Sequence, residues 1–401
     1  MMRIEGGVTA PKGFRASGVA AGIKPGTTKK DCALIVSDVS AAIAGTFTTN
    51  RFKAPPVKWS ETVCARGVGR AIFANSGNAN AATGDQGYAD ARASAEQVAQ
   101  GLSVPAEQVC VLSTGVIGVP LPMDRISMGV KDCLESLSAS GSGDAARAIM
   151  TTDTVSKEMA VEIPMGKGSA RIGAIAKGSG MIAPNMATMF CLITTDAAVE
   201  SKVLADLLRR AVGVSFNQMC VDNDMSTSDS VICLANGASG VPAIEPGTDD
   251  FAAFGVALID VCQEMAKALV RDGEGATKFV EIVVTGTATD REAKVIARSI
   301  ATSQLCKTAF FGQDPNWGRI ACAAGYAGVA FDPESVSIWI DDVQVMSDGM
   351  PAEYEEAEAA ACMRKPEFCI RVNVGNGPGT SVFWTSDLSH QYVEINADYR
   401  T

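Results

Sequence analysis

The sequence predicts a layered α/β protein. Two observations lead to this fold class: apolar runs of strand length recur along the 401 residues, and amphipathic helical segments lie between them. A hydrophobic fraction of 47% provides for a large core, and the length is typical of two or three structural units. Because such strands and one-sided helices each have an apolar face to cover, we expect helices packed on sheets.

Strands and helices are expected to alternate throughout. The helical segment 201–214 places Leu204 and Leu208 on one face, and segment 251–270 repeats this spacing after Thr248, which is positioned to cap it. The expected strands cover residues 33–39, 41–49, 70–75, 170–176, 190–195, 280–285, 336–340, 368–374 and 381–384.

The amino-acid composition limits the classes of molecule that the protein is expected to bind. The formal net charge of -11 argues against nucleic acid and against an anionic membrane surface, since both require clustered positive charge. The N-terminus lacks the features of a signal peptide, and charges interrupt the Ala-rich stretch 251–270, so we expect no membrane span. The 12 cysteines include no CxxC pair, which indicates buried thiols in a reducing cytoplasm and no metal site. The substrates are expected to be small molecules.

Segment 176–197 is the most informative part of the chain. A loop rich in Gly and Pro leads into the apolar run 189–195, which has the composition of a strand buried on both faces. Thr188 therefore presents a hydroxyl at the mouth of a sheet. A Thr that begins a strand is common in sheet proteins, so the position alone does not indicate catalysis.

Histidine chemistry is restricted to one residue. His390 is the single histidine and lies in a predicted strand, where a packed or hydrogen-bonded role is commoner than catalysis. If a hydroxyl is the nucleophile, its base is expected to be a lysine, a carboxylate or an α-amino group freed by chain cleavage.

Glycine-rich segments do not form nucleotide-binding motifs. Segments 75–84, 272–278 and 375–380 lack GxGxxG after a strand and GxxxxGK[ST], so tight turns are the favoured interpretation. Segment 113–118, STGVIG, can direct a hydroxyl and a backbone N–H to one point, as in an oxyanion hole, or form only a turn.

Over essentially its whole length the chain resembles the glutamate N-acetyltransferases of arginine biosynthesis, the ornithine acetyltransferase family. Eight motifs in the same order make the resemblance highly specific. They are GGVTAPKGF at 6–14, NSGNANAATG at 75–84, STGVIG at 113–118, MTTDT at 150–154, KGSGMIAPNMATM at 177–189, DGEGATK at 272–278, FGQDPNWGRI at 311–320 and NADYRT at 396–401.

The resemblance implies a layered α-β-β-α-type sandwich with a smaller C-terminal lobe and an active site between the lobes. We expect an N-terminal lobe of residues 1–240 and a C-terminal lobe of residues 241–401, with the Gly- and Pro-rich segment 236–247 at the boundary. Autocatalytic cleavage between Ala187 and Thr188 would give an α chain, 1–187, and a β chain, 188–401. The two chains are expected to pair as an α2β2 heterotetramer.

The resemblance also implies the reaction. Thr188 would be the N-terminal nucleophile and its own α-amino group the base, which accounts for the scarcity of histidine, because such an amine has an ordinary pKa of about 7.7–8.0. Acetyl would pass from N2-acetyl-L-ornithine to L-glutamate in a ping-pong reaction without a cofactor. No motif decides whether acetyl-coenzyme A is a second donor, because the family contains monofunctional and bifunctional members.

Matching motif positions imply the roles of individual residues. Thr114 and Gly115 would form the oxyanion hole, with the Thr114 hydroxyl and the Gly115 N–H as donors. Losing one such donor typically costs about 3–4 kcal/mol of transition-state stabilisation.

Five further residues are expected to line the substrate pocket with Thr188: Thr151, Lys177, Glu274, Asn396 and Thr401. Lys177 is suited to neutralise a carboxylate and Glu274 to pair with an ammonium. The alternative is that Lys177 and Glu274 are surface charges on loops.

The chain departs from the family pattern in three places. Val155, Ser156 and Lys157 follow the TTDT run, where the family commonly has a proline, and Ala82 replaces a common cysteine. The usual VDGDTSTND-like segment is VDNDMSTSD at 221–229, and its changes affect a segment expected near the site.

Two readings from other classes remain open. A self-cleaving aminopeptidase or amidase would share the nucleophile and oxyanion hole but pass the acyl group to water. A non-catalytic α/β binding protein would use the glycine-rich loops as turns and Thr188 as an ordinary strand residue.

Overall fold

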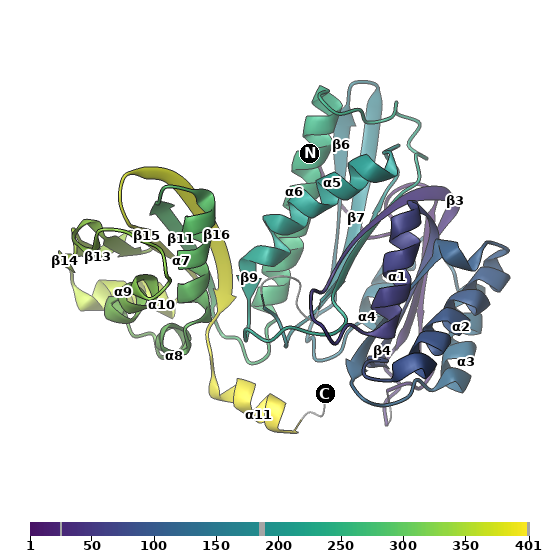
Figure 1. Ribbon diagram of the computed structural model, residues 1–401, viewed down its shortest axis with the longest axis horizontal. Helices are drawn as coiled ribbons and strands as arrows, with labels where there is room; N and C mark the ends of the chain where they lie inside the picture. Colours follow the sequence, from purple (N-terminus) through teal and green to yellow (C-terminus); the bar gives the residue numbers. More distant parts are fainter. Residues whose placement is uncertain (25, 184–188, 399–401) are drawn as a thin grey trace.

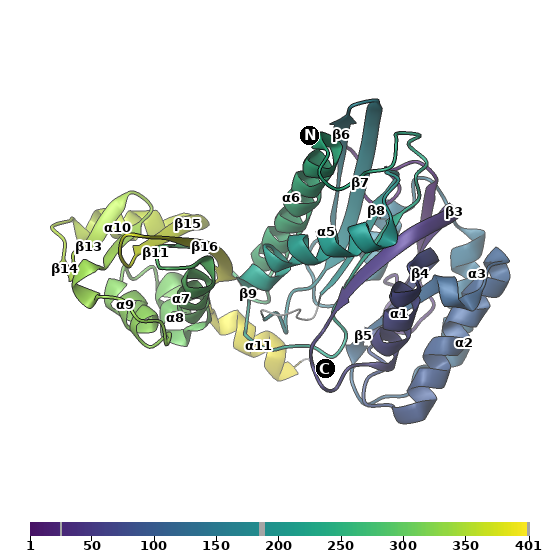
Figure 2. The same cartoon turned by 45° about the horizontal axis from the view of Figure 1, so that its top comes forward.

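The computed structural model describes residues 1–24, 26–183 and 189–398, and its two β-sheets are covered by helices (Figure 1). The predicted α/β fold class is confirmed. The N-terminal part of the chain forms the larger lobe, and the C-terminal part forms the smaller one. The last helix leaves the smaller lobe and lies beneath the junction of the two lobes (Figure 2).

The larger sheet has the strand order β1-β6-β7-β8-β10-β3-β4-β5, with β2 paired to β3. Strands β7 and β8 are antiparallel, whereas β8 and β10 run parallel, as do β4 and β5. The bounds are β1 (Met2–Ile4), β2 (Phe14–Val19), β3 (Cys32–Phe47), β4 (Val68–Asn78), β5 (Val109–Val116), β6 (Lys157–Met165), β7 (Gly168–Lys177), β8 (Phe190–Thr195) and β10 (Ser230–Ala235).

Strand β8 is buried along its whole length, as its composition predicts. Cys191 and Ile193 belong to one hydrophobic core, and Phe190 and Leu192 belong to another. Alternate side chains thus enter cores on opposite faces of the sheet, which explains why the first four residues of the strand, 190–193, are apolar without interruption.

Helices cover this sheet from several sides. Helix α6 packs on β6 and β7 and helix α5 on β3, while α1 and α2 contact β5 and α4 contacts β2. Thr248 caps α6 as predicted, because its Oγ1 accepts a hydrogen bond from the backbone N–H of Phe251 at 3.2 Å. The bounds are α1 (Pro55–Arg66), α2 (Gly84–Leu102), α3 (Met123–Glu135), α4 (Ser142–Ala148), α5 (Ser201–Gly213) and α6 (Asp249–Arg271).

The smaller sheet has the order β14-β13-β12-β15-β11-β16-β9. Helix α7 packs on β11 and β16, and α10 contacts β12, β13 and β15. The strands are β9 (Met219–Cys220), β11 (Phe279–Gly286), β12 (Ser337–Ile340), β13 (Val343–Ser347), β14 (Met350–Pro351), β15 (Glu367–Asn373) and β16 (Gly377–Ser386). The helices are α7 (Asp290–Thr302), α8 (Gln304–Gly312), α9 (Trp317–Gly325), α10 (Glu356–Arg364) and α11 (His390–Asp398).

The chain does not pass from the larger sheet to the smaller one at the lobe boundary predicted between residues 240 and 241. Helix α6 lies beyond that boundary, yet its apolar face, including Phe254 and Leu258, belongs to the core of the larger sheet. The segment 236–247 therefore connects two elements of one lobe. The chain enters the smaller sheet at β11, after a first contact through β9, which pairs with β16.

Candidate active site

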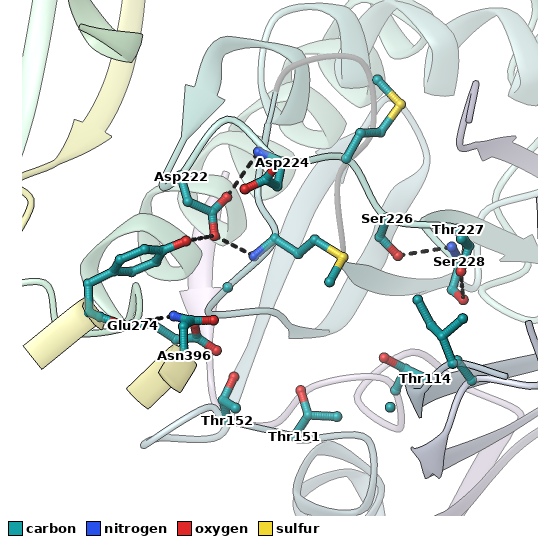
Figure 3. Close-up of a pocket in the computed structure, with 17 residues that line it drawn as sticks. Thr114, Thr151, Thr152, Asp222, Asp224, Ser226, Thr227, Ser228, Glu274 and Asn396 are labelled. Carbon is teal, nitrogen blue, oxygen red and sulfur yellow. Dashed lines mark hydrogen bonds between the residues drawn. The ribbon is translucent and has the colours of Figure 1, made fainter. Parts of the chain in front are cut away.

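A cavity of about 230 Å³ brings together loops that are distant in the sequence (Figure 3). Its walls come from the ends of β4 and β5, from loops near residues 151, 180, 225 and 274, and from α11. The lining residues are Ala79, Thr114, Gly115, Ile117, Thr151, Thr152, Gly180, Met181, Asp222, Asp224, Met225, Ser226, Thr227, Ser228, Glu274, Tyr392 and Asn396. The cavity therefore contains Thr114, Gly115, Thr151, Glu274 and Asn396, five of the predicted site residues.

Thr114 and Gly115 lie near the end of β5, where the strand runs beside β4. Gly115 pairs with Gly77 across the two strands and has a φ of +130°. A Cβ added at Gly115 would lie 2.4 Å from the carbonyl carbon of Gly77, so no larger residue fits without a backbone shift. The close approach of the two strands explains the glycine of the STG sequence.

Lys177 stands behind this wall and does not line the cavity. Its side chain is buried, and its Nζ donates a hydrogen bond to Thr114 Oγ1 at 3.0 Å. The ammonium also lies 5.7 Å from the centre of the Phe190 ring. Burial lowers the pKa of Lys177, against the opposing charges of Asp153 and Asp229. The alternative that Lys177 is a surface charge is wrong.

Glu274 is fixed in the opposite wall. Asn396 Nδ2 donates to Glu274 Oε2 at 2.8 Å, and the Glu274 backbone N–H donates to the Ser179 carbonyl at 2.9 Å. A Cβ at Gly180 would lie 2.3 Å from the Glu274 carboxyl carbon, so this glycine leaves the space that the carboxylate occupies. Glu274 is buried, and the alternative that it is a surface charge is wrong as well.

Asp222 is a site residue that the sequence did not single out. Its carboxylate accepts backbone hydrogen bonds from Met181 at 2.6 Å and Ile182 at 2.7 Å, and one from the Tyr392 hydroxyl at 3.3 Å. Burial raises the pKa of Asp222 to about 6. The available signal was the segment 221–229, which was expected near the site and does line the cavity.

The same segment contributes hydroxyl groups. Ser226, Thr227 and Ser228 line the cavity wall beside Thr114 (Figure 3). Thr48 Oγ1 donates to the Ser226 carbonyl at 2.8 Å, which ties the segment to the end of β3. These residues were not predicted either, because contacts between positions so distant in the chain leave no local pattern.

Asn223 occupies the position of the glycine in the expected VDGDTSTND-like pattern. Its φ is +67°, in the left-handed region. Asn enters this region more readily than most residues, so the backbone can turn here without a glycine.

A buried ionic cluster anchors Thr151. The Thr151 backbone N–H donates to Asp153 Oδ2 at 3.0 Å, and Lys157 Nζ lies 2.8 Å from Asp153 Oδ1 and 2.5 Å from Asp272 Oδ2. Burial opposes ionisation of Asp153, yet the charges of Lys157 and Lys177 hold its pKa below the ordinary value. The cluster thus joins the turn at Thr151 to the loop that carries Glu274.

Asp229 lies at the start of β8 and β10. Its side chain is fully buried, and Oδ1 accepts a hydrogen bond from the Met189 backbone N–H at 2.9 Å. Burial raises the pKa of Asp229 to about 8. This carboxyl group therefore fixes the backbone of the residue that follows Thr188 in the sequence.

Three predicted site residues, Ala187, Thr188 and Thr401, lie outside the described residues, and their roles remain predictions. The strand predicted around His390 is wrong, since this residue begins helix α11. Its ring makes an edge contact with Phe311, with centroids 5.6 Å apart.

The described part of the chain forms neither a metal-binding cluster nor a membrane-spanning helix. Within residues 1–24, 26–183 and 189–398, no group of three or more His, Cys, Asp and Glu side chains is placed to hold a metal ion. No helix in these ranges combines the length and apolarity needed to cross a membrane.

Comparison with known proteins identifies the family. The Arginine biosynthesis bifunctional protein ArgJ of Symbiobacterium thermophilum is 48% identical over 399 residues, 99% of each chain. Its namesake from Geobacter sulfurreducens is 48% identical over 97% of this chain and 99% of its own. The crystal structure of argJ from Bacillus halodurans matches 52% of this chain and 98% of its own chain, with 40% identity and a TM-score of 0.51. A sequence model of the ArgJ family matches residues 15–401, and the chain belongs to this family.

Proposed function

We propose that this chain transfers the acetyl group of N2-acetyl-L-ornithine to L-glutamate through an acetyl-enzyme, and so produces L-ornithine and N-acetyl-L-glutamate. Acetyl transfer in arginine biosynthesis follows from the family and from relatives that are 48% identical over nearly their whole length. One observation in the cavity supports the substrate class: Thr114 lies on the opposite side from Glu274 and Asn396 (Figure 3).

This arrangement suits an acylated diamino acid. Glu274, Asp222 and Asp224 give the far side of the cavity an acidic character that favours an ammonium group. Thr114 and Gly115 can direct an O–H and an N–H to the oxygen of a tetrahedral intermediate. A substrate with a cationic end and an acyl end therefore fits the polarity of the cavity.

The chemistry begins with maturation. The Thr188 hydroxyl would attack the Ala187 carbonyl carbon, the peptide nitrogen would leave as the α-amine of Thr188, and water would then hydrolyse the resulting ester. The cut frees the Ala187 carboxylate and an N-terminal amine beside the hydroxyl. One cleavage thus supplies both the nucleophile and its base.

Transfer then takes two steps. The α-amine accepts the proton of the Thr188 hydroxyl as the oxygen attacks the acetyl carbonyl, and the same proton passes to the departing ornithine amine. The neutral amine of glutamate next attacks the acetyl ester and loses a proton to the α-amine. The α-amine passes this proton to the Thr188 oxygen as the ester C–O bond breaks, so N-acetylglutamate leaves and the free hydroxyl and amine are restored. Thr114 and Gly115 would stabilise the oxyanion in both steps, and no cofactor is required.

Relatives named as bifunctional support a second activity. We infer that acetyl-coenzyme A also donates acetyl to the Thr188 hydroxyl, which would give N-acetylglutamate without acetylornithine. Assays with each donor separately test this activity, and an enzyme inert toward the thioester would be monofunctional.

The assembly and location follow as further proposals. We propose an α2β2 heterotetramer of cleaved chains in the cytoplasm. The free, mostly buried cysteines support a reducing compartment. Native mass determination tests the assembly, and a mass equal to one α and one β chain would contradict it.

The decisive experiment is the intact mass of the denatured protein with N-terminal sequencing. Fragments of 187 and 214 residues, about 19 and 22 kDa of the 41.5 kDa chain, are expected, the larger beginning at Thr188. Release of ornithine that depends on glutamate then separates transfer from hydrolysis. Release of ornithine in the absence of glutamate, with water as the acyl acceptor, would favour an amidase. A full-length chain together with an active Thr188→Ala variant would refute Thr188 as the nucleophile.

A further inference from the structure

Segment 221–229 contacts the chain on both sides of the expected cut between residues 187 and 188. It connects β9 of the smaller sheet to β10 of the larger sheet, and residues 225–228 within it line the cavity that contains Thr114 (Figure 3). Near its beginning the segment binds residues 181 and 182, and at its last residue it binds Met189. We call these contacts the upstream anchor and the downstream anchor. The residues that lie between them in the sequence, 183–188, include the expected cut.

The upstream anchor is made by Asp222. Its Oδ2 accepts a hydrogen bond from the Met181 backbone N–H at 2.6 Å, and its Oδ1 accepts one from the Ile182 N–H at 2.7 Å. In return, the Ile182 carbonyl accepts the N–H groups of residues 221, 222 and 223 at 2.9, 3.3 and 3.4 Å. Met181 has a φ of +57°, a left-handed conformation that a residue with a long side chain rarely adopts. Such a conformation persists only where its surroundings hold it, and the carboxylate does so here by binding both N–H groups.

The downstream anchor is made by Asp229. Its Oδ1 accepts the hydrogen bond from the Met189 N–H at 2.9 Å, and the Met189 carbonyl accepts one from the Ser230 N–H at 3.1 Å. The Asp229 side chain is fully buried, so water does not compete for this contact. One acceptor oxygen is sufficient for the downstream anchor, whereas the upstream anchor requires two.

The segment that carries both anchors is itself fixed to the end of β3. Thr48 donates to two of its carbonyl groups, from Oγ1 to Ser226 at 2.8 Å and from the backbone N–H to Asp229 at 3.0 Å. Asn50 Nδ2 donates to the Met225 carbonyl at 3.0 Å. Because the segment is held in this way between its ends, the two anchors keep a constant separation.

We propose that Asp222 and Asp229 are positioning residues for self-cleavage, which together hold the chain so that the Thr188 hydroxyl can attack the Ala187 carbonyl carbon. In that step the O–C bond forms, the peptide C–N bond breaks, the hydroxyl proton passes to the departing nitrogen, and water then hydrolyses the ester. An attack within one chain is fast only when the reacting atoms are already close and aligned, and fixing the chain at both ends limits the other conformations. The inference rests on the proposed function, because it requires the cut between residues 187 and 188.

The rate of self-cleavage of the full-length chain tests the proposal. The chain is synthesised in a short cell-free pulse at pH 7, and intact mass then follows its conversion into the fragments 1–187 and 188–401. Asp222→Asn keeps one oxygen and can accept from only one of the two N–H groups. Its cleavage half-time should lengthen by about 10–100-fold, since a displacement of about 1 Å can slow a reaction by about 100-fold.

The downstream anchor predicts a different pattern. Asp229→Leu removes the acceptor and should slow cleavage as much as Asp222→Asn does. Asp229→Asn keeps the one oxygen that is needed, and it also matches the charge, because burial raises the pKa of Asp229 to about 8 and the group is mostly neutral at pH 7. Cleavage of Asp229→Asn should therefore stay close to the wild-type rate. If Asp229→Asn were as slow as Asp229→Leu, the acid itself would be required for the chemistry and the positioning role would be refuted.

Asp196 provides a matched control for stability. It is a buried carboxylate directly after β8, and it also accepts two backbone hydrogen bonds, from Arg171 at 2.7 Å and from Lys12 at 2.9 Å. Asp196→Asn should lower the melting temperature about as much as Asp222→Asn but leave the cleavage half-time unchanged. If both variants slowed cleavage equally, the rate would report only the stability of the fold, and the proposal would fail.

Asp224 provides a matched control for charge. Like Asp222 it lines the cavity, but it takes part in the upstream anchor with its backbone N–H, which donates to Asp222 Oδ1 at 3.2 Å. Asp224→Asn removes the same charge from the cavity and keeps this N–H, so cleavage should proceed at the wild-type rate. A half-time as long as that of Asp222→Asn would assign the effect to charge and refute the anchor.

A second substitution tests whether Asp222 acts on the left-handed turn. Glycine adopts a positive φ without steric cost, so Met181→Gly should restore part of the cleavage rate in the Asp222→Asn background. A double variant no faster than Asp222→Asn would refute the upstream anchor. Wild-type rates in both Asp222→Asn and Asp229→Leu would overturn the whole proposal while leaving the proposed function intact. A wild-type chain that stays uncut would instead refute self-cleavage itself, and the inference with it.

Discussion

The buried ionic cluster around Lys157 gives a prediction whose size follows from the structure. The Lys157 side chain is 2% exposed, and the side chains of Asp153 and Asp272 are 0% and 5% exposed. Removing the cation in Lys157→Met leaves two carboxylates buried without their common partner. Breaking a buried pair in this way costs about 3–5 kcal/mol, so the free energy of unfolding should fall by that amount.

Urea unfolding, followed by tryptophan fluorescence at pH 7, measures this loss. The control is Arg209→Met, because the side chains of Arg209 and Asp206 are 70% and 76% exposed and such pairs contribute about 0–1 kcal/mol. A loss below about 1 kcal/mol in Lys157→Met would refute the reasoning. It would mean that water or rearranged backbone groups satisfy both carboxylates without the lysine.

The cluster also predicts a pH dependence. The pKa of Asp153 is depressed in the folded chain, so the stability it contributes is present above the ordinary pKa and is lost as the pH falls through the folded value. Without the Lys157 charge the folded pKa rises. The acid-sensitive part of the stability curve should therefore shrink in Lys157→Met, and an unchanged curve would contradict the depressed pKa.

Two other variants test the cavity, and a third tests the buried carboxyl group at the start of β8 and β10. Glu274→Gln should raise the KM for N-acetylornithine by about 10–100-fold, since a charged hydrogen bond contributes about 1.5–3 kcal/mol, and an unchanged KM would remove this residue from the site. Gly115→Ala should lower kcat by about 100-fold, because its Cβ would displace the backbone at Gly77, whereas a wild-type kcat would exclude the N–H as an oxyanion donor. Asp229→Asn keeps a side-chain oxygen that can accept the hydrogen bond from the Met189 N–H, but it removes the ionisable carboxyl group. Because burial raises the pKa of Asp229 to about 8, wild-type stability falls as the pH rises from about 4 to 8, by up to about 1.4 kcal/mol per pH unit, and this slope should flatten in the variant. Urea unfolding at pH 5 and pH 7.5 measures the slope, and a variant with the wild-type slope would count against the assignment.

The parts of the fold that could be predicted have a strong local signal. The expected strand 190–195 coincides with β8, and the expected helix 201–214 agrees with α5 to within one residue. The strand begins with a continuous apolar run, and the helix has one clearly apolar face. Strand β10 was missed although its sequence, SVICLA, is buried throughout. Helix α11 was mistaken for a strand, since it has no buried face to impose a helical period.

Long-range contacts explain what the sequence could not predict about the site. Helix α11 is held over the cavity by polar contacts, Tyr392 to Asp222 and Asn396 to Glu274, each across more than 100 residues. Motif resemblance located Glu274 and Asn396, but no pattern related Asp222 to either of them. The position of Lys177 behind Thr114 likewise depends on the register of β7 and on the end of β5, which lie in different parts of the sheet.

The strand order has a consequence for a chain that is cut at residues 187/188. Strands β8 and β10 would then belong to the β chain, while their neighbours β7 and β3 would belong to the α chain. The strands β8 and β10 of one fragment would thus lie between strands of the other fragment and form backbone hydrogen bonds with them on both sides. Separating the fragments would require breaking the hydrogen bonds of the sheet on both sides of the inserted strands. Cleavage of this one peptide bond should therefore lower the stability of the folded protein little, and the two fragments should remain associated until the protein is denatured.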